Sequence, residues 1–274
     1  AFLEKTLSEK FPEEYARMRE GDESGLSTVL TDYWHTVPDW DNLIKFGFSG
    51  ILKNAIAKRH EFGSQGDARA VEFLDSVIIR YEAIIKLLKR IYNYSLKFDV
   101  PEFSSAVLNL ISSPPATLYE AMLFSVLFLY VLEIGCERGR SLGSIDKLYY
   151  SFYKKELEKG KTREEIKELF RYFFIHFTAT KRFAQQPILL CGSDAFGNDK
   201  TNELSAFILE VYDELNILDP KIHIRYHKNI DKAVFTKVLL MIRKGHSSIC
   251  IVNDDVVYKG YEKLGISASD AEKY

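Results

Sequence analysis

The chain has 274 residues, of which 46% are apolar and 28% are charged, so it can bury a real hydrophobic core in one large or two ordinary domains. Its formal net charge of -2, from 37 basic and 39 acidic residues, creates no long-range field that favours nucleic acid or an anionic membrane. The longest apolar run, around residues 122–134, is interrupted by polar side chains and is too short to span a bilayer, so neither nucleic acid nor a membrane is an expected partner.

The first part of the chain has the periodicity of helices. Residues 1–34 mix short helical patterns with a polar loop at residues 21–25. A loop with a proline, residues 34–41, precedes an amphipathic segment at residues 42–58 that is helical by pattern. Over residues 67–97 apolar side chains recur at spacings of three and four, which predicts a long amphipathic helix whose first aspartate is a suitable cap.

Three further helices are predicted before the sequence begins to alternate strand and helix patterns. One follows Pro114 and Pro115, because proline is tolerated in a first turn but not in a helix interior. This helix is apolar almost all round, which indicates burial on every side. Another covers residues 145–159 and ends before a glycine, and the next starts with Thr162 and Glu165 at capping-box spacing.

The last third of the chain alternates strands with helices. Short apolar runs at residues 187–191, 222–226 and 248–252 are bounded by Gly, Asp, Asn or Pro, as is typical of buried strands. Helical patterns at residues 202–215 and 231–244 separate them. This alternation predicts an α/β unit, with a parallel or barrel-like sheet, docked on a helical layer.

Polar groups near the predicted strands are candidate sites, and each has a structural alternative. The loop GSDAFGND at residues 192–199 lacks the spacing of a calcium loop, and turn and capping roles explain all of its residues. His223 and His227 can share a strand face, so a metal site stays open, although no third ligand lies nearby. Residues 253–255, NDD, follow a strand directly, where α/β proteins contact ligands, but they are also ordinary capping residues.

The cysteines indicate the cellular compartment, and the first residue indicates whether the sequence is a whole polypeptide. Cys136, Cys191 and Cys250 lie far apart without CxxC spacing, which favours neither a disulfide framework nor a cysteine zinc site. A reducing cytoplasm is therefore expected. The chain starts at Ala1 without a secretory signal pattern, so we expect an excerpt of a longer polypeptide.

Four stretches match, in the same order, the motifs of one known family. Residues 34–51, WHTVPDWDNLIKFGFSGI, resemble GHxxPDYxKxLxxGFxGI, and residues 114–122, PPATLYEAM, resemble PxTxxEAL. Residues 141–165, SLGSIDKLYYSFYKKELEKGKTREE, resemble SxGRxDQYLYPYYxxDLxxGxxTxEE. The segment from QPILLCGSDAFGNDKTNELS through RYHK, NDD and SDAEKY resembles QNLTxGGxDxxGxDxTNELS, RxHK, NDD and DAxDY. The chain thus resembles the glycyl radical enzymes, the superfamily of pyruvate formate-lyase and glycerol dehydratase.

The resemblance implies a fold class. It is an α/β fold in which a helical layer surrounds a ten-stranded barrel built from two five-stranded halves. Within one domain portion, residues 1–183 are expected to form mainly helical wrapping, and residues 184–274 to start the first half-barrel. Because a thiyl or carbon radical is destroyed by side reactions when it is exposed, the family needs such a closed, dry cavity.

The resemblance also implies cofactors and partners. In the family, an activating enzyme with an iron-sulfur cluster and S-adenosylmethionine abstracts a hydrogen from a C-terminal glycine, and the radical moves to a cysteine that attacks the substrate. The cysteine is expected just after Tyr274 and the glycine further on, so no catalytic residue and no directly bound cofactor are expected within this chain. A small-molecule substrate, the radical-activating enzyme and a second copy in a homodimer are the expected partners.

Three residues are expected to bind substrate by their positions in these motifs. His35 matches the histidine that hydrogen-bonds the substrate hydroxyl in the dehydratase branch, and alternatively it holds the local turn. Arg138 and Gly139 replace a substrate-contacting HS pair, which argues against glycerol or propanediol and opens the way to an anionic substrate, unless Arg138 faces Glu137. Gln185 stands where many members carry a pocket aromatic.

Further departures affect the pocket rather than the fold. Ser144 replaces the arginine of SxGR, Lys147 replaces the glutamine of DQY, and Pro187 replaces the asparagine of QN. The expected function is thiyl-radical cleavage of a C–C or C–X bond in a small polar metabolite, of the formate acyltransferase, dehydratase or decarboxylase type. The alternatives are a catalytically inactive truncated homologue that acts as a scaffold or binds a partner, and a metal-dependent enzyme that uses His223 and His227.

Overall fold

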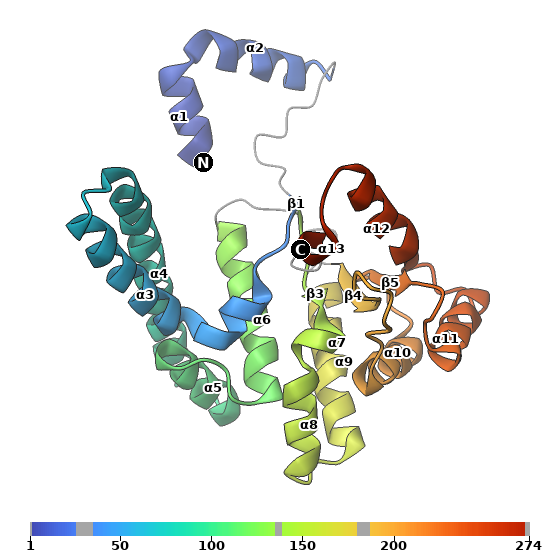
Figure 1. Cartoon of the computed structure of the whole chain (residues 1–274). Coiled ribbons are helices and arrows are strands. Elements are labelled where there is room, and N and C mark those ends of the chain that lie inside the picture. Colours follow the sequence, from blue (N-terminus) through green and yellow to red (C-terminus); the bar gives the residue numbers. More distant parts are fainter. Residues whose placement is uncertain (1, 26–34, 135–138, 180–186, 272–274) are drawn as a thin grey trace.

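The structure is a computed structural model of the chain, and it describes residues 2–25, 35–134, 139–179 and 187–271 (Figure 1). Helices dominate as far as residue 179. They are α1 (Phe2–Lys10), α2 (Pro12–Glu23), α3 (Trp40–Ser64), α4 (Ala68–Ser95), α5 (Pro101–Ser112), α6 (Leu118–Ile134), α7 (Ile145–Leu148), α8 (Tyr150–Glu158) and α9 (Arg163–Ala179).

Short strands and further helices complete the described part. These are β1 (His35–Thr36), β2 (Gly139–Arg140), β3 (Gly143–Ser144), β4 (Ile188–Cys191), α10 (Glu203–Leu215), β5 (Ile222–Tyr226), α11 (Lys232–Arg243), β6 (Ile249–Asn253), α12 (Asp254–Lys263) and α13 (Ala268–Ala271). The predicted alternation of strand and helix in the last third is confirmed.

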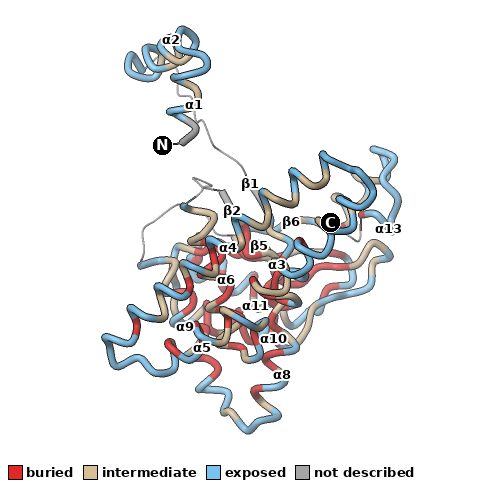
Figure 2. Tube along the Cα trace, turned by 90° about the vertical axis from the view of Figure 1, so that its left-hand side faces the viewer, coloured by how far each residue is buried: buried red, intermediate tan, exposed pale blue. Residues whose placement is uncertain are grey.

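The first two helices stand apart from the rest of the molecule (Figures 1 and 2). The loop predicted at residues 21–25 is wrong in its first part, because α2 continues to Glu23 and a turn starts only at Ser24. One reason is local. Arg19 lies 3.8 Å from the carboxylate of Asp22 and 3.2 Å from that of Glu23, so i+3 and i+4 ion pairs support the last turn of the helix.

The long helices α3 and α4 pack side by side (Figure 1). The predicted cap of α4 is confirmed, since the Asp67 carboxylate accepts a hydrogen bond from the Ala70 amide at 3.0 Å. The helix α3 has a kink at Gly47, whose φ of 61° lies in the left-handed region. An added Cβ there would lie 2.8 Å from the Cα atom of Pro114, so glycine permits the close approach of α3 to the loop before α6.

The apolar helix α6 lies in the core, as its all-round apolar sequence predicts. Leu118, Ala121 and Phe124 are fully buried. The centre of the Phe124 ring lies 4.3 Å from the centre of the Phe48 ring in α3. Figure 2 shows buried segments at the centre of the body. Over the described ranges, no helix combines the length and the apolar character needed to cross a membrane.

The segment predicted as one helix over residues 145–159 is divided into α7 and α8 at Tyr149. The Tyr149 ring is fully buried, and its hydroxyl donates a hydrogen bond to the Ser125 hydroxyl of α6 at 2.7 Å. The capping box predicted for the next helix is confirmed. The Thr162 amide donates to the Glu165 carboxylate at 2.7 Å, and the Glu165 amide donates to the Thr162 hydroxyl at 3.2 Å.

The main sheet has four parallel strands in the order β3-β4-β5-β6, and β1 and β2 form a separate parallel pair. Side chains alternate across the strands. On one face Ile188, Leu190, Ile222 and Ile224 are fully buried and join a core shared with α10. The predicted parallel sheet is therefore confirmed, and it brings the carboxyl ends of β4, β5 and β6 to one edge.

Candidate functional site

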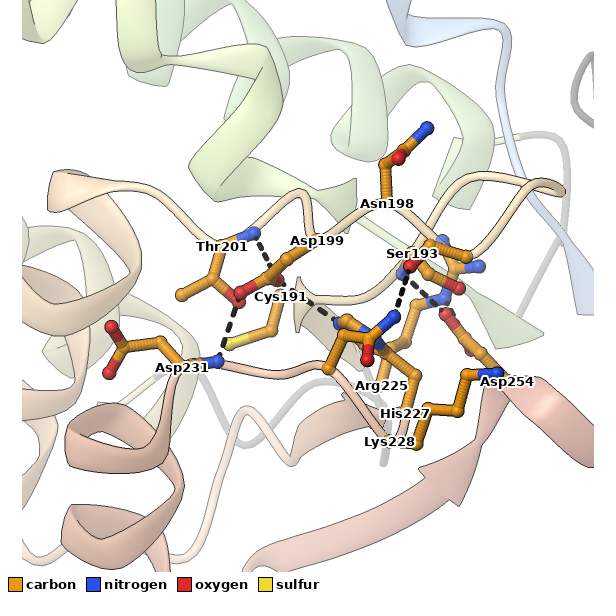
Figure 3. Close-up of polar contacts among 12 residues, drawn as sticks. Cys191, Ser193, Asn198, Asp199, Thr201, Arg225, His227, Lys228, Asp231 and Asp254 are labelled. Atoms are coloured by element: carbon orange, nitrogen blue, oxygen red, sulfur yellow. Dashed lines mark hydrogen bonds and ion pairs between the residues drawn. The ribbon is translucent and has the colours of Figure 1, made fainter.

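The polar residues that follow β4, β5 and β6 meet at this edge of the sheet (Figure 3). Cys191 at the end of β4 is the register partner of Arg225 on β5, and Arg225 is the partner of Val252 on β6. The loop after β4 therefore lies beside the segments after β5 and β6. The carboxyl edge of a parallel sheet is where α/β proteins bind ligands, so we treat this cluster as the candidate site.

An ion pair between a partly buried arginine and a buried aspartate joins the three strand ends. The Asp254 side chain is 1% exposed, and its two oxygens accept hydrogen bonds from the Arg225 Nε at 3.0 Å and from the Ser193 amide at 2.9 Å. Burial opposes the charge on Arg225, but Asp254 and then Tyr258 raise the pKa of the guanidinium above its ordinary value. The Tyr258 hydroxyl donates to the Ser193 carbonyl at 3.1 Å. This cluster fixes the start of α12 against the loop after β4.

Gly192 is required by this packing. Its φ is +103°, a conformation that side-chain-bearing residues rarely adopt. An added Cβ would lie 3.0 Å from the Asp254 Oδ2 and 3.1 Å from the Arg225 Cβ. Both backbone conformation and space therefore restrict this position to glycine.

A second pair joins the same loop to the segment after β5. The His227 imidazole is completely buried, and its Nε2 lies 3.1 Å from the Asp199 Oδ1. Asp199 also accepts hydrogen bonds from the amides of Thr201 and Asp231, each at 2.9 Å. Burial pushes the pKa of Asp199 up, but its hydrogen bonds outweigh burial and hold that pKa below the usual value. The His227 Nδ1 is buried without a hydrogen-bond partner among the described residues.

The geometry does not assemble a metal site around the histidines at positions 223 and 227. The Nε2 of His227 faces Asp199, whereas His223 is a half-buried strand residue whose register partner is Cys250. In the described part of the chain, no group of three or more His, Cys, Asp or Glu side chains could hold a metal ion.

The turn role predicted for the GSDAFGND loop is confirmed, and so is the capping role predicted for NDD, at Asn253. Asp194 accepts from the amides of Phe196 and Asn198, each at 2.9 Å, and these bonds close the turn. The cap of α10 is not a residue of this loop but Asn202, which forms a capping box with Ser205. The Asn253 side chain caps α12 by accepting a hydrogen bond from the Val256 amide. These side chains therefore build the loop and fix the starts of α10 and α12.

Sequence reasoning missed the role of Asp146 in α7. Its side chain is buried and accepts hydrogen bonds from the Cys191 amide at 2.7 Å, the Ser205 hydroxyl at 2.6 Å and the Lys147 amide at 2.9 Å. Burial raises the pKa of Asp146 to about 6, and burial together with Asp146 raises the pKa of the Cys191 thiol to about 12. The available signal was the aspartate of the DQY motif, which Asp146 matches.

The three residues predicted to bind substrate are only partly placed. His35 lies in β1, and its backbone is the register partner of Gly139 in β2, which directly follows Arg138 in the chain. Arg138 and Gln185 lie outside the described residues. The substrate-binding role of all three stays a prediction.

Hydrogen bonds tie together stretches that carry the motifs. The Trp40 indole N–H of α3 donates to the Ser141 carbonyl at 2.9 Å, and the Ser141 hydroxyl donates to the Pro187 carbonyl at 2.9 Å. Gly143 has a φ of +68°, and an added Cβ would lie 3.2 Å from the Trp40 ring. The first, third and fourth motif stretches therefore meet at the start of the sheet, although they lie far apart in the sequence.

A family model described as Pyruvate formate lyase-like matches residues 1–274, the whole chain. The chain belongs to the pyruvate formate lyase-like family. The chain is 23% identical over 271 residues to the (2S)-3-sulfopropanediol dehydratase of Klebsiella oxytoca. The matched region covers 88% of this chain and 33% of that relative. The chain therefore spans about a third of the length of that relative, in agreement with the prediction of an N-terminal portion.

Solved structures of low sequence identity share the fold. A glycyl radical enzyme from Archaeoglobus fulgidus has a TM-score of 0.78 and 22% identity, over 98% of this chain and 40% of that one. The glycerol-bound B12-independent glycerol dehydratase from Clostridium butyricum has a TM-score of 0.78 and 21% identity, over 88% of this chain and 34% of that one. The predicted fold class, a helical layer around part of a glycyl radical enzyme barrel, is confirmed.

Proposed function

We propose that this chain is part of a glycyl radical enzyme that cleaves a C–C or C–X bond of a small polar metabolite. The observation that carries the proposal is the match of the pyruvate formate lyase-like family over residues 1–274. The parallel sheet supports it, because one face is buried against helices while the other carries partly buried residues such as Leu189 and His223. A sheet of this kind can form one wall of a closed reaction chamber.

Dehydration is the reaction type to test first. The relatives include a dehydratase of sulfopropanediol and a dehydratase of glycerol, two small polyols. The substitution of the HS pair by Arg138 and Gly139 favours a substrate with an anionic group over glycerol itself. Acyl transfer and decarboxylation are the other outcomes of the same radical chemistry.

We assign substrate contacts to His35, Arg138 and Gln185. The pairing of His35 with Gly139 supports this assignment for the first two, because it brings the backbone of one motif residue next to the segment that contains the other. The proposal includes a radical-activating enzyme, a homodimer and a cytoplasmic location. The proposal assigns no catalytic residue to this chain and expects the glycyl radical and the thiyl cysteine elsewhere in the full-length protein.

The test uses the full-length natural protein that contains this chain. Anaerobic incubation with its activating enzyme and S-adenosylmethionine is expected to produce an organic-radical signal in electron paramagnetic resonance. His35→Ala and Arg138→Ala are expected to keep that signal and lower kcat/KM by about tenfold or more, because each removes a hydrogen bond to the substrate.

The matched control is His60→Ala, which removes an exposed histidine of α3 and is expected to leave kcat/KM unchanged. Absence of any radical signal after activation would contradict the enzymatic proposal and favour the inactive scaffold. A radical signal with unchanged kcat/KM in the His35 and Arg138 variants would contradict only the assignment of substrate contacts.

A further inference from the structure

A groove of about 420 Å³ lies away from the strand ends, between the first turns of α3, the loop before α6 and the pair α7–α8. Its volume is in the range of small-molecule sites. Side chains of Ile44, Leu148 and Phe152 and the rings of Pro114 and Pro115 supply apolar surface.

The walls of the groove are held by packing and hydrogen bonds. The Glu120 Oε2 accepts from the Ala116 amide at 2.7 Å and from the Asn109 side chain at 3.0 Å, which fixes the proline loop. Gly47 allows that loop to approach α3 closely, as described above. Trp40 fixes the start of α3 to the segment before α7 through its bond to the Ser141 carbonyl. A groove held in this way needs little ordering when a ligand binds.

Positive charge predominates at the rim. Three lysines and one carboxylate line the groove, and Lys147 pairs with Asp41 at 2.9 Å. Lys45 and Lys155 form no ion pair with any residue that the structure describes, and their ammonium groups lie 5.1 Å and 6.0 Å from the centres of neighbouring phenylalanine rings. A concave surface lined by one sign of charge raises the local concentration of ligands of opposite charge.

One of these charges departs from the family motif. Lys147 stands where the motif DQY carries a neutral glutamine. With a glutamine at this position, two lysines and Asp41 would remain in the lining, and the groove would keep less positive charge. The substitution therefore makes the groove more selective for anions.

We propose that this groove binds a small organic anion with an apolar body, such as a phosphate monoester or a carboxylate that carries a ring. The anionic group lies between Lys45 of α3 and Lys155 of α8, and the body packs on Leu148, Phe152 and the proline rings. The site is separate from the proposed radical chemistry and does not depend on it.

The test is a calorimetric titration of the full-length natural protein that contains this chain, without radical activation, with phenyl phosphate at low ionic strength. We expect saturable binding at one site, and binding of inorganic phosphate at least tenfold weaker because it lacks an apolar body. The double variant K45Q/K155Q is expected to weaken phenyl phosphate at least tenfold, since it removes both unpaired cations. Added salt is expected to weaken binding as well.

The control is the double variant K86Q/K89Q, which makes the same change of charge at two exposed lysines of α4. Its affinity for phenyl phosphate is expected to stay within twofold of the unchanged chain. Circular dichroism checks that all three proteins are equally folded. The proposal is overturned by a lack of saturable binding, by equal loss in the two double variants, or by inorganic phosphate binding as tightly as phenyl phosphate.

Discussion

Asp146 joins three elements through a single buried carboxylate. It accepts hydrogen bonds from the amide at the end of β4, from the Ser205 hydroxyl at the start of α10, and from the amide of the next residue in α7. The Asn202 side chain also donates to the Asp146 carbonyl at 3.1 Å, so the helix cap and the carboxylate form one network. Burial nevertheless raises the pKa of this carboxylate to about 6, because its negative charge is removed from water.

Asp146→Asn is expected to change the pH dependence of stability. The folded state binds the Asp146 proton more tightly than the unfolded chain, whose ordinary value is 3.8. Its contribution therefore favours folding at low pH and is lost as the pH rises through about 6. Two pKa units correspond to about 3 kcal/mol. Between about pH 4 and pH 7.5, urea unfolding is expected to show that the free energy of unfolding of the original chain falls by most of that amount relative to the variant.

The control for this experiment is Asp99→Asn, the same change at an exposed carboxylate between α4 and α5. It is expected to leave the slope of stability against pH as it is in the original chain. Parallel profiles for the original chain and Asp146→Asn would show that Asp146 does not titrate in this range.

At the scale of elements, the strand ends are held by contacts between segments rather than by the strands alone. The loop after β4, the end of β5 and the start of α12 meet at Gly192, Arg225 and Asp254. Because Gly192 has no side chain, the loop after β4 lies close to α12, and the Asp254 carboxylate reaches the Ser193 amide. A side chain at this glycine would separate the three segments.

Gly192→Ala is expected to destabilise the chain more than Gly245→Ala. Both glycines have a φ near +100°, at +103° and +99°, but an added Cβ at Gly245 meets nothing within 4 Å. The left-handed backbone is expected to cost about 1–2 kcal/mol in both variants. Crowding against Asp254 and Arg225 is expected to add about 1–3 kcal/mol at Gly192 alone. Urea unfolding measures both, and equal losses would show that the strand ends relax around the new methyl group.

At the scale of the whole molecule, the sheet ends at an open edge among the described residues. Its order is β3-β4-β5-β6, and β6 pairs only with β5. Cys250 of β6 is exposed, and Ile251 is 45% exposed. An exposed edge strand with apolar side chains is a template for pairing with another chain.

The 274-residue chain is therefore expected to self-associate through β6, and Ile251→Lys is expected to shift it toward the monomer. A lysine on an edge strand opposes pairing, because its charge would have to be buried in the new sheet. Light scattering after size exclusion, over a range of concentrations, measures the effect. Leu264→Lys is the control, since Leu264 is 77% exposed and lies after α12, outside the sheet. A monomer at every concentration would contradict the expectation.

Local patterns were sufficient for much of the fold. The stripe of α4, its Asp67 cap, the Thr162 capping box and the runs of β4, β5 and β6 depend on residues a few positions apart, so periodicity and capping rules predict them. The family follows from the order of the motifs. By contrast, the two-residue strands β1, β2 and β3 have no length in which a period can appear, and they form only because distant segments pair.

Packing alone decided how the polar residues are used. Arg225 and Asp254 are 29 positions apart, and Asp146 is 45 positions from Cys191, so no local rule couples them. The same holds for the groove, whose lysines come from separate stretches that only the folded chain brings together. The physical reason is that a cap or a stripe is satisfied within one turn of helix or one strand, whereas a buried charge needs the partner that tertiary packing places beside it.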